Sequence, residues 1–180
     1  MLDGDIRVLF AEDSEDVINI FRSSIDRLGW KGLYVGNAVE IIHTVNNMLS
    51  EGIELDAVVA DLSFSQGPKL TAVTAVRELR KAMPNVPVIF ISPYVTSMIR
   101  EEVRRVKGEI IQAPFDMDQL FVRLSQLIYW SRVVLSNEYE GDNKRHESIN
   151  RSNNFRRATD YILSTPERIA ETLKGLKDKT

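Results

Sequence analysis

Three acidic side chains stand where short apolar segments end. Glu12 and Asp13 directly follow the apolar segment 6–11, and Asp61 follows the segment 55–60. Ligands of open parallel sheets bind beyond the carboxyl ends of the strands, so these carboxylates would converge at one edge if both segments are strands. Carboxylates held close together repel one another and need a compensating cation. Hard oxygen ligands of this kind suit Mg²⁺, and the first prediction is therefore a magnesium site.

A metal-bound carboxylate can also accept a phosphoryl group, because such transfer depends mainly on positioning and charge neutralisation. Ser92, at the end of the apolar segment 86–91, could donate a hydrogen bond to the phosphoryl oxygens. Simpler roles compete with these. Glu12 and Asp13 could only cap a helix, Asp61 could be an ordinary loop residue, and Ser92 could be a turn residue before Pro93.

The elements that would position these residues alternate along the chain. Strands are expected at 6–11, 33–35, 55–60, 86–91 and 109–112. Apolar residues at helical spacing follow each of them, with Asp13 and Ser14 as capping side chains and Gly29 as the end of the first helix. Asp116 can cap a long last helix that runs through Val134. Five rounds of strand then helix predict an α/β fold, a doubly wound parallel sheet with helices on both faces.

Four segments, VLFAEDSED, VVADLSF, VIFISPY and IIQAPFD, are similar in order and spacing to the signature segments of response regulator receiver domains. The resemblance covers roughly residues 5–136. It implies a five-stranded flavodoxin-like sheet of order 2-1-3-4-5. It also implies Asp61 as the phosphoacceptor, Ser92 as the switch hydroxyl, and Glu12, Asp13, Asp61 and the backbone carbonyl of Ser63 as Mg²⁺ ligands. The implied partner is a histidine kinase or a phosphotransfer protein, and the implied output is a protein–protein contact.

Two positions depart from the family pattern. Ala113 stands where the family has a lysine before the proline. Ile110 stands where the family usually has an aromatic residue that is the partner of the switch hydroxyl. The adjacent Gln112 is a poor substitute for the lysine, since neighbouring strand residues point to opposite faces. These departures keep an alternative open, a pseudo-receiver that acts as an interaction module and is not productively phosphorylated.

Composition narrows the remaining classes. The chain has 180 residues, a net charge of -3 and no cysteine, which excludes disulfides and thiolate chemistry and gives no electrostatic case for nucleic-acid binding. It shows no signal peptide and no apolar run of about 18 residues, so we expect a cytoplasmic protein without a membrane span. No enzymatic activity is expected beyond phosphorylation and dephosphorylation of the aspartate itself. An aspartate-nucleophile phosphatase would need a second acid where Ser63 stands.

The chain divides into an expected receiver domain at 1–136, whose last helix is extended, and a polar linker with a short helical tail at 137–180. The last helix carries apolar residues beyond the usual end of a compact receiver domain, among them Ile128 and Trp130. An apolar extension must be covered. A homodimer or output contact through this helix or the tail is one reading, and a tail that folds back over the helix is the other.

Overall fold

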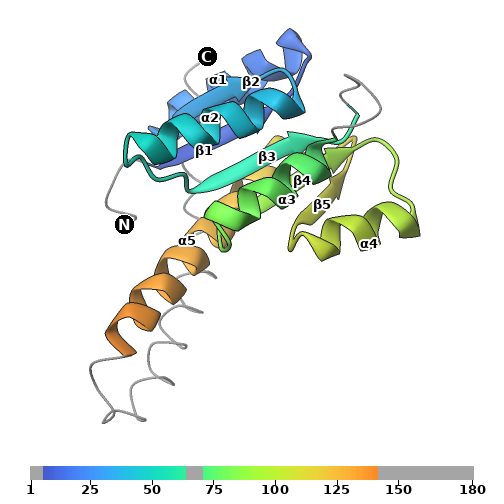
Figure 1. Cartoon of the computed structure of the whole chain (residues 1–180). Coiled ribbons are helices and arrows are strands. Elements are labelled where there is room, and N and C mark those ends of the chain that lie inside the picture. Colours follow the sequence, from blue (N-terminus) through green and yellow to red (C-terminus); the bar gives the residue numbers. More distant parts are fainter. Residues whose placement is uncertain (1–5, 64–70, 142–180) are drawn as a thin grey trace. The chain divides into compact units, whose positions relative to one another are not determined.

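The computed structural model describes residues 6–63 and 71–141, except the side chains of 133–141. The chain forms two compact units, Met1–Phe115 and Asp116–Thr180. The first unit contains a five-stranded parallel sheet of order β2-β1-β3-β4-β5, which confirms the predicted fold class and strand order (Figure 1). Its strands are β1 (Arg7–Ala11), β2 (Lys31–Val35), β3 (Ala57–Asp61), β4 (Val88–Ser92) and β5 (Glu109–Gln112).

The register of the sheet brings the carboxyl ends of its strands to one edge. Ala11, the last residue of β1, pairs with Val35 at the end of β2 and with Ala60 near the end of β3. Ser92, the last residue of β4, pairs with Gln112 at the end of β5. The segments that follow the strands, including Glu12 and Asp13, are therefore gathered at this edge.

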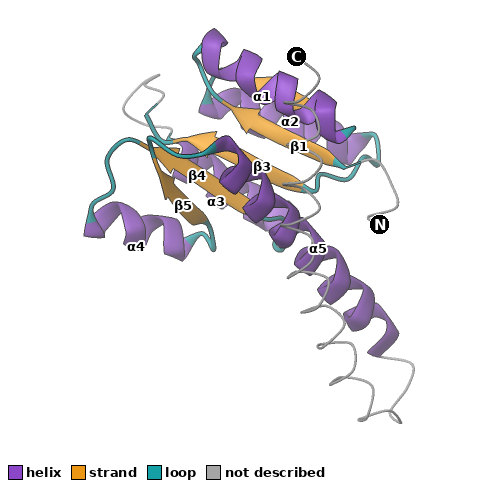
Figure 2. Ribbon diagram, turned by 180° about the vertical axis from the view of Figure 1, so that it is seen from behind, coloured by secondary structure: helices purple, strands orange, loops and turns teal. Residues whose placement is uncertain are grey.

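Helices cover both faces of the sheet, as the sequence predicts (Figure 2). Strand side chains alternate between the faces. On one face, Leu9, Val58 and Phe90 form a buried core with apolar residues of α2 (Ala38–Ser50), α3 (Ala72–Ala82) and α4 (Ser97–Arg105). On the other face, the Phe10 ring stacks on Phe21 of α1 (Glu15–Leu28), with ring centroids 4.8 Å apart.

Helix ends agree only partly with the sequence prediction. Gly29 closes α1 in the left-handed conformation, with φ of 68°, as expected of a helix-terminating glycine. Ser14 is the N-cap residue of α1, immediately before the helix. Its side chain makes no capping hydrogen bond, so the prediction that the Ser14 hydroxyl caps α1 is wrong. The N–H of Ser14 donates instead to Glu12 Oε1 at 3.0 Å. The carboxylate before the helix, rather than the hydroxyl at its start, therefore organises this turn.

Arg80, near the end of α3, ties two connecting segments together. Its guanidinium donates to the backbone carbonyls of Val106 at 2.8 Å and Lys107 at 3.1 Å, in the turn between α4 and β5. It also donates to the carbonyls of Met83, Pro84 and Val86, which lead into β4. Burial lowers the pKa of Arg80, because charge is costly away from water. The segments that enter β4 and β5 are thus held by one side chain.

The second unit contains α5 (Met117–Gly141). Asp116 caps this helix as predicted, because its Oδ1 accepts the N–H of Asp118 at 2.8 Å. The buried residues recur at helical spacing, at positions 120, 121, 124 and 128. The helix continues to Gly141, and the remainder of the expected tail, residues 142–180, lies outside the described residues. Within the described ranges, no helix combines the length and apolarity needed to cross a membrane.

A candidate metal and phosphoryl site at the edge of the sheet

The structure brings Glu12, Asp13 and Asp61 together. One carboxylate oxygen from each residue lies within 4.8 Å of the other two. Glu12 and Asp13 are placed by the turn after β1, and Asp61 is the last residue of the neighbouring strand β3. The convergence predicted from the topology is therefore confirmed, whereas the metal-binding role of these residues stays a prediction.

The donor set fits a small divalent cation. Mg²⁺ binds oxygen ligands in octahedral geometry at about 2.0–2.1 Å and keeps several waters, so its ligand oxygens lie about 3–4 Å from one another. The three carboxylate oxygens lie within 4.8 Å of one another, so side-chain rotation could bring them to this spacing. Glu12 is buried, Asp61 is half-buried and Asp13 is exposed, so the cluster opens toward solvent on one side.

The electrostatics of Glu12 show that the cluster carries uncompensated negative charge. Glu12 is only 7% exposed, and this burial is the largest cause of its raised pKa. The negative charges of Asp61 and Asp13 raise the pKa further, while the hydrogen bond from the Ser14 N–H lowers it. The nearby charges that act on Glu12 are thus carboxylates, and a cation bound among them would neutralise them.

Asp61 is oriented by the loop that follows it. The N–H of Ser63 donates to Asp61 Oδ1 at 2.8 Å, so one carboxylate oxygen is fixed by the backbone. The second carboxylate oxygen of Asp61 accepts no hydrogen bond from the described residues, so it is available to bind a ligand or to act as a nucleophile. The backbone carbonyl of Ser63 as a metal ligand stays a prediction.

Ser92 is buried, and its hydroxyl is engaged locally. Its Oγ donates to the carbonyl of Tyr94 at 2.8 Å and accepts the N–H of Tyr94 at 3.2 Å. This closed turn agrees with the simpler role considered above, a turn residue before Pro93. A contact with a phosphoryl group would require the hydroxyl to leave the Tyr94 carbonyl, so the switch role stays a prediction. Tyr94 itself is 78% exposed.

The end of β5 supplies no cation to the site. The N–H of Ala113 donates to the carbonyl of Ser92 at 2.9 Å, which continues the pairing of β4 and β5 by one residue. Its methyl group carries no charge. The neighbouring Gln112 directs its amide to the carbonyl of Pro93 at 3.4 Å. Ile110 packs against the apolar core. At this edge of the sheet, the two positions that depart from the family pattern, Ala113 and Ile110, thus supply neither a cation nor an aromatic ring.

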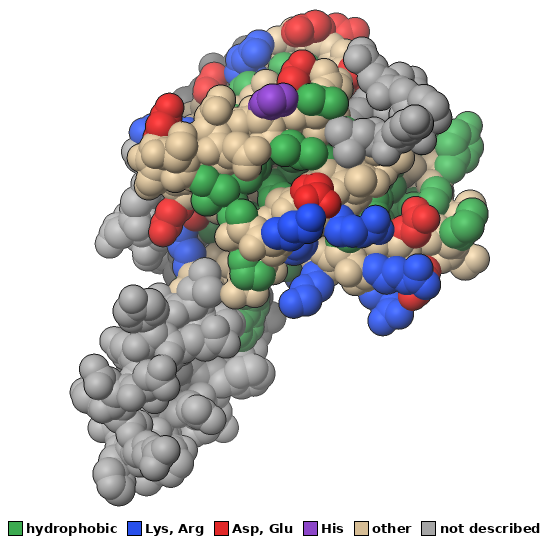
Figure 3. Space-filling view, in the orientation of Figure 1, with side chains coloured by type: hydrophobic (Ala, Val, Ile, Leu, Met, Phe, Trp, Pro, Cys, Tyr) green, Lys and Arg blue, Asp and Glu red, His purple; other side chains and the backbone are tan. Residues whose placement is uncertain are grey.

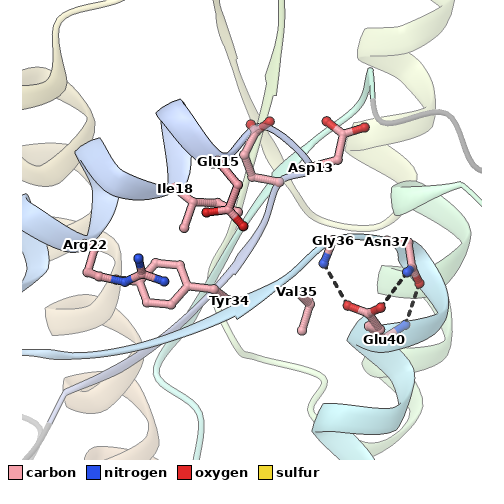
Figure 4. Close-up of a pocket in the computed structure, with 10 residues that line it drawn as sticks. Asp13, Glu15, Ile18, Arg22, Tyr34, Val35, Gly36, Asn37 and Glu40 are labelled. Atoms are coloured by element: carbon pink, nitrogen blue, oxygen red, sulfur yellow. Dashed lines mark hydrogen bonds between the residues drawn. The ribbon is translucent and has the colours of Figure 1, made fainter.

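A groove of about 430 Å³ adjoins Glu12 and Asp13, and sequence reasoning missed most of its wall. Arg22 of α1 lies over the Tyr34 ring at one end, 4.9 Å from the ring centroid (Figure 4). At the other end, Glu40 accepts the N–H of Gly36 at 2.8 Å. The backbone N–H of Glu40 in turn donates to the side-chain Oδ1 of Asn37 at 3.0 Å, so these two residues together cap the start of α2. The spacing of Asn37 and Glu40 is the sequence signal that could have revealed this cap.

Sequence comparison finds similarity to a sensor kinase and to a transcriptional regulatory protein, although no family model matches the chain. It is 29% identical over 128 residues to the sensor kinase CckA of Brucella abortus, covering 71% of this chain and 13% of that protein. It is 24% identical over 119 residues to the uncharacterized transcriptional regulatory protein YrkP of Bacillus subtilis, covering 66% of this chain and 47% of that protein. The chain thus spans less than half the length of either relative.

Comparison with solved structures identifies the fold. A response regulator receiver protein from Sinorhizobium medicae superposes with a TM-score of 0.60 at 24% identity, covering 73% of this chain and 99% of that one. The receiver domain of the sensor histidine kinase PA1611 from Pseudomonas aeruginosa, solved with magnesium in its active site cleft, gives 0.58 at 20% identity, covering 70% and 99%. The chain therefore has the fold of response regulator receiver domains.

Proposed function

We propose that this chain is a response regulator receiver protein that accepts a phosphoryl group on Asp61. The observation that carries the proposal is the cluster of Glu12, Asp13 and Asp61 at the carboxyl edge of the sheet. The donor would be a histidine kinase or a phosphotransfer protein, and the output would be a contact with another protein, with a homodimer through α5 or the tail as one form. The cytoplasm is the expected compartment.

Glu12, Asp13, Asp61 and the backbone carbonyl of Ser63 would hold Mg²⁺. When bound, this ion supplies positive charge to the carboxylates and to the phosphoryl oxygens. The free oxygen of Asp61 attacks the phosphorus, the bond between phosphorus and the donor imidazole nitrogen breaks, and that nitrogen keeps the electron pair. The Ser63 N–H, 2.8 Å from Asp61 Oδ1, keeps the carboxylate oriented during this step. Ser92 would then leave the Tyr94 carbonyl and donate to a phosphoryl oxygen.

The test is a phosphorylation assay on the full chain with the small phosphodonor acetyl phosphate and MgCl₂. We expect the intact mass to rise by one phosphoryl group, with no rise in EDTA or in the Asp61→Asn variant. Titration calorimetry with MgCl₂ alone should show binding that Asp13→Asn weakens. A chain that takes up no phosphoryl group and binds no Mg²⁺ would contradict the proposal.

A second candidate, the pseudo-receiver interaction module, is favoured by Ala113. No basic group contributes to the pKa shift of Glu12, and Ala113 adds no cation at the end of β5. A charge-assisted hydrogen bond is worth about 1.5–3 kcal/mol, so its absence weakens any binding of a phosphoryl group. The Ala113→Lys variant separates the two candidates. A large gain in phosphate uptake supports the pseudo-receiver, whereas high uptake by the unaltered chain contradicts it.

A further inference from the structure

Among the described residues, Lys and Arg are concentrated in one part of the chain. Residues 77–107 contain seven Lys or Arg and three Glu, which gives this segment a net charge of +4, while the whole chain carries -3. The segment includes the second half of α3 and all of α4. The space-filling view shows Lys and Arg side chains gathered over these two helices, with acidic side chains interspersed among them (Figure 3).

Contacts of Arg80 explain why the two helices present their charges together. Its guanidinium joins α3 to the turn after α4 through the carbonyls of Val106 and Lys107. Arg77 precedes Arg80 by one helical turn and so lies on the same side of α3, and Lys81 directly follows Arg80. Arg80 finds only backbone carbonyls as acceptors among the described residues, so its own charge is not cancelled by a carboxylate.

The glutamates of this surface neutralise only part of its charge. Glu101 alone serves two arginines, at 2.9 Å to Arg104 and 3.2 Å to Arg105. Lys81 pairs with Glu78 at 2.5 Å. Arg77 and Lys107 are exposed and make no ion pair with the described residues. The surplus of positive charge therefore faces solvent, where an approaching anionic group can reach it.

We infer that this surface, formed by Arg77, Lys81, Arg104, Arg105 and Lys107 and called here the α3–α4 basic surface, docks an acidic segment of a partner protein. Guanidinium groups bind carboxylates in a two-pronged geometry, and exposed charges of one sign steer an oppositely charged partner. The interspersed glutamates oppose a nucleic-acid backbone, whose evenly spaced phosphates would meet repulsion at several points. A short run of carboxylates can fit between them. The inference requires no phosphorylation of Asp61.

The test uses the full chain and a short fluorescein-labelled poly-L-glutamate peptide in a fluorescence anisotropy titration. The double variant Arg77→Gln with Lys107→Asn removes two charges that make no ion pair with the described residues. Asparagine suits the positive φ of 53° at position 107. The matched control, Arg27→Gln with Lys31→Gln, removes the same charge from α1 and β2. Thermal melts establish that both variants are folded.

We expect the unaltered chain to bind the peptide at low ionic strength and more weakly near 0.15 M salt. The α3–α4 double variant should lose about fivefold or more in affinity, and the control less than about twofold, as expected for two exposed charge contacts. Several results would overturn the inference. These are no binding at low salt, equal loss in both variants, tighter binding of a single-stranded oligonucleotide of the same charge, or self-association that the α3–α4 variant abolishes.

Discussion

Neutralising Glu12 should make the metal-free protein more stable. Glu12 is 7% exposed, and its carboxylate lies in a cluster whose three oxygens are within 4.8 Å of one another. Its raised pKa reports that the charged form is disfavoured, first by burial and then by Asp61 and Asp13. The Glu12→Gln variant removes the charge and keeps an oxygen that can accept the Ser14 N–H. The repulsion should disappear with little change in shape.

The size of the effect follows from the geometry. Two unit charges about 4.8 Å apart repel by about 0.9 kcal/mol in water and by about 3.5 kcal/mol at an effective dielectric constant of about 20. Asp13 is exposed, so the repulsion from its charge lies near the lower value. The hydrogen bond from Ser14 becomes a neutral one and weakens. We expect a net gain of about 1–2 kcal/mol in the free energy of unfolding, or about 3–6 °C in Tm.

The assay is thermal unfolding of the full chain in EDTA and in MgCl₂. The unaltered protein should be stabilised by Mg²⁺ by an amount that grows with the logarithm of the free Mg²⁺ concentration and reaches about 2.7 kcal/mol at a hundredfold excess over Kd. Glu12→Gln should unfold at higher temperature in EDTA and gain little from Mg²⁺. The control is Glu15→Gln, an exposed acid in the first turn of α1. A variant that is less stable than the unaltered chain in EDTA, and that responds fully to Mg²⁺, would refute the reasoning.

Two predictions concern the scaffold. Arg80→Lys should lower the free energy of unfolding by about 1–3 kcal/mol, because a lysine cannot reach Val106 and the segment before β4 at once, whereas the exposed Arg77→Lys should change it by less than about 0.5 kcal/mol in urea unfolding. Gly108→Ala should cost about 1–3 kcal/mol in the same assay, since the added Cβ would lie 2.6 Å from Cε2 of the fully buried Phe90 and force that ring to move. An unchanged urea midpoint for Gly108→Ala would show that the ring adapts freely.

The fold and the acidic cluster could be predicted because both follow from general rules. Alternating apolar segments predict the parallel sheet, and the carboxyl ends of its strands then bring Glu12, Asp13 and Asp61 to one edge. Boundaries were less accurate. The strand expected from 55 begins at Ala57, and the helix expected through Val134 continues to Gly141.

Some features leave too little trace in the sequence to be found this way. The five acceptors of Arg80 are backbone carbonyls, which every residue has, so no residue pattern indicates this contact. The sequence does not indicate which acceptor the hydroxyl of Ser92 bonds, and in the structure it is the carbonyl of Tyr94. The groove beside Glu12 depends on how Arg22 and Tyr34 stack, which is a property of packing rather than of spacing.

The way Arg80 binds has a consequence for sequence divergence. Because its acceptors belong to the main chain, the amino acids at positions 83–86 and 106–107 can be exchanged without loss of the contact, provided the local backbone path is kept. Homologues that share this architecture should therefore retain an arginine at this place in α3 while the surrounding loops drift. In a homologue that lost the arginine, we expect either shorter loops or another side chain that donates several hydrogen bonds to the same carbonyls.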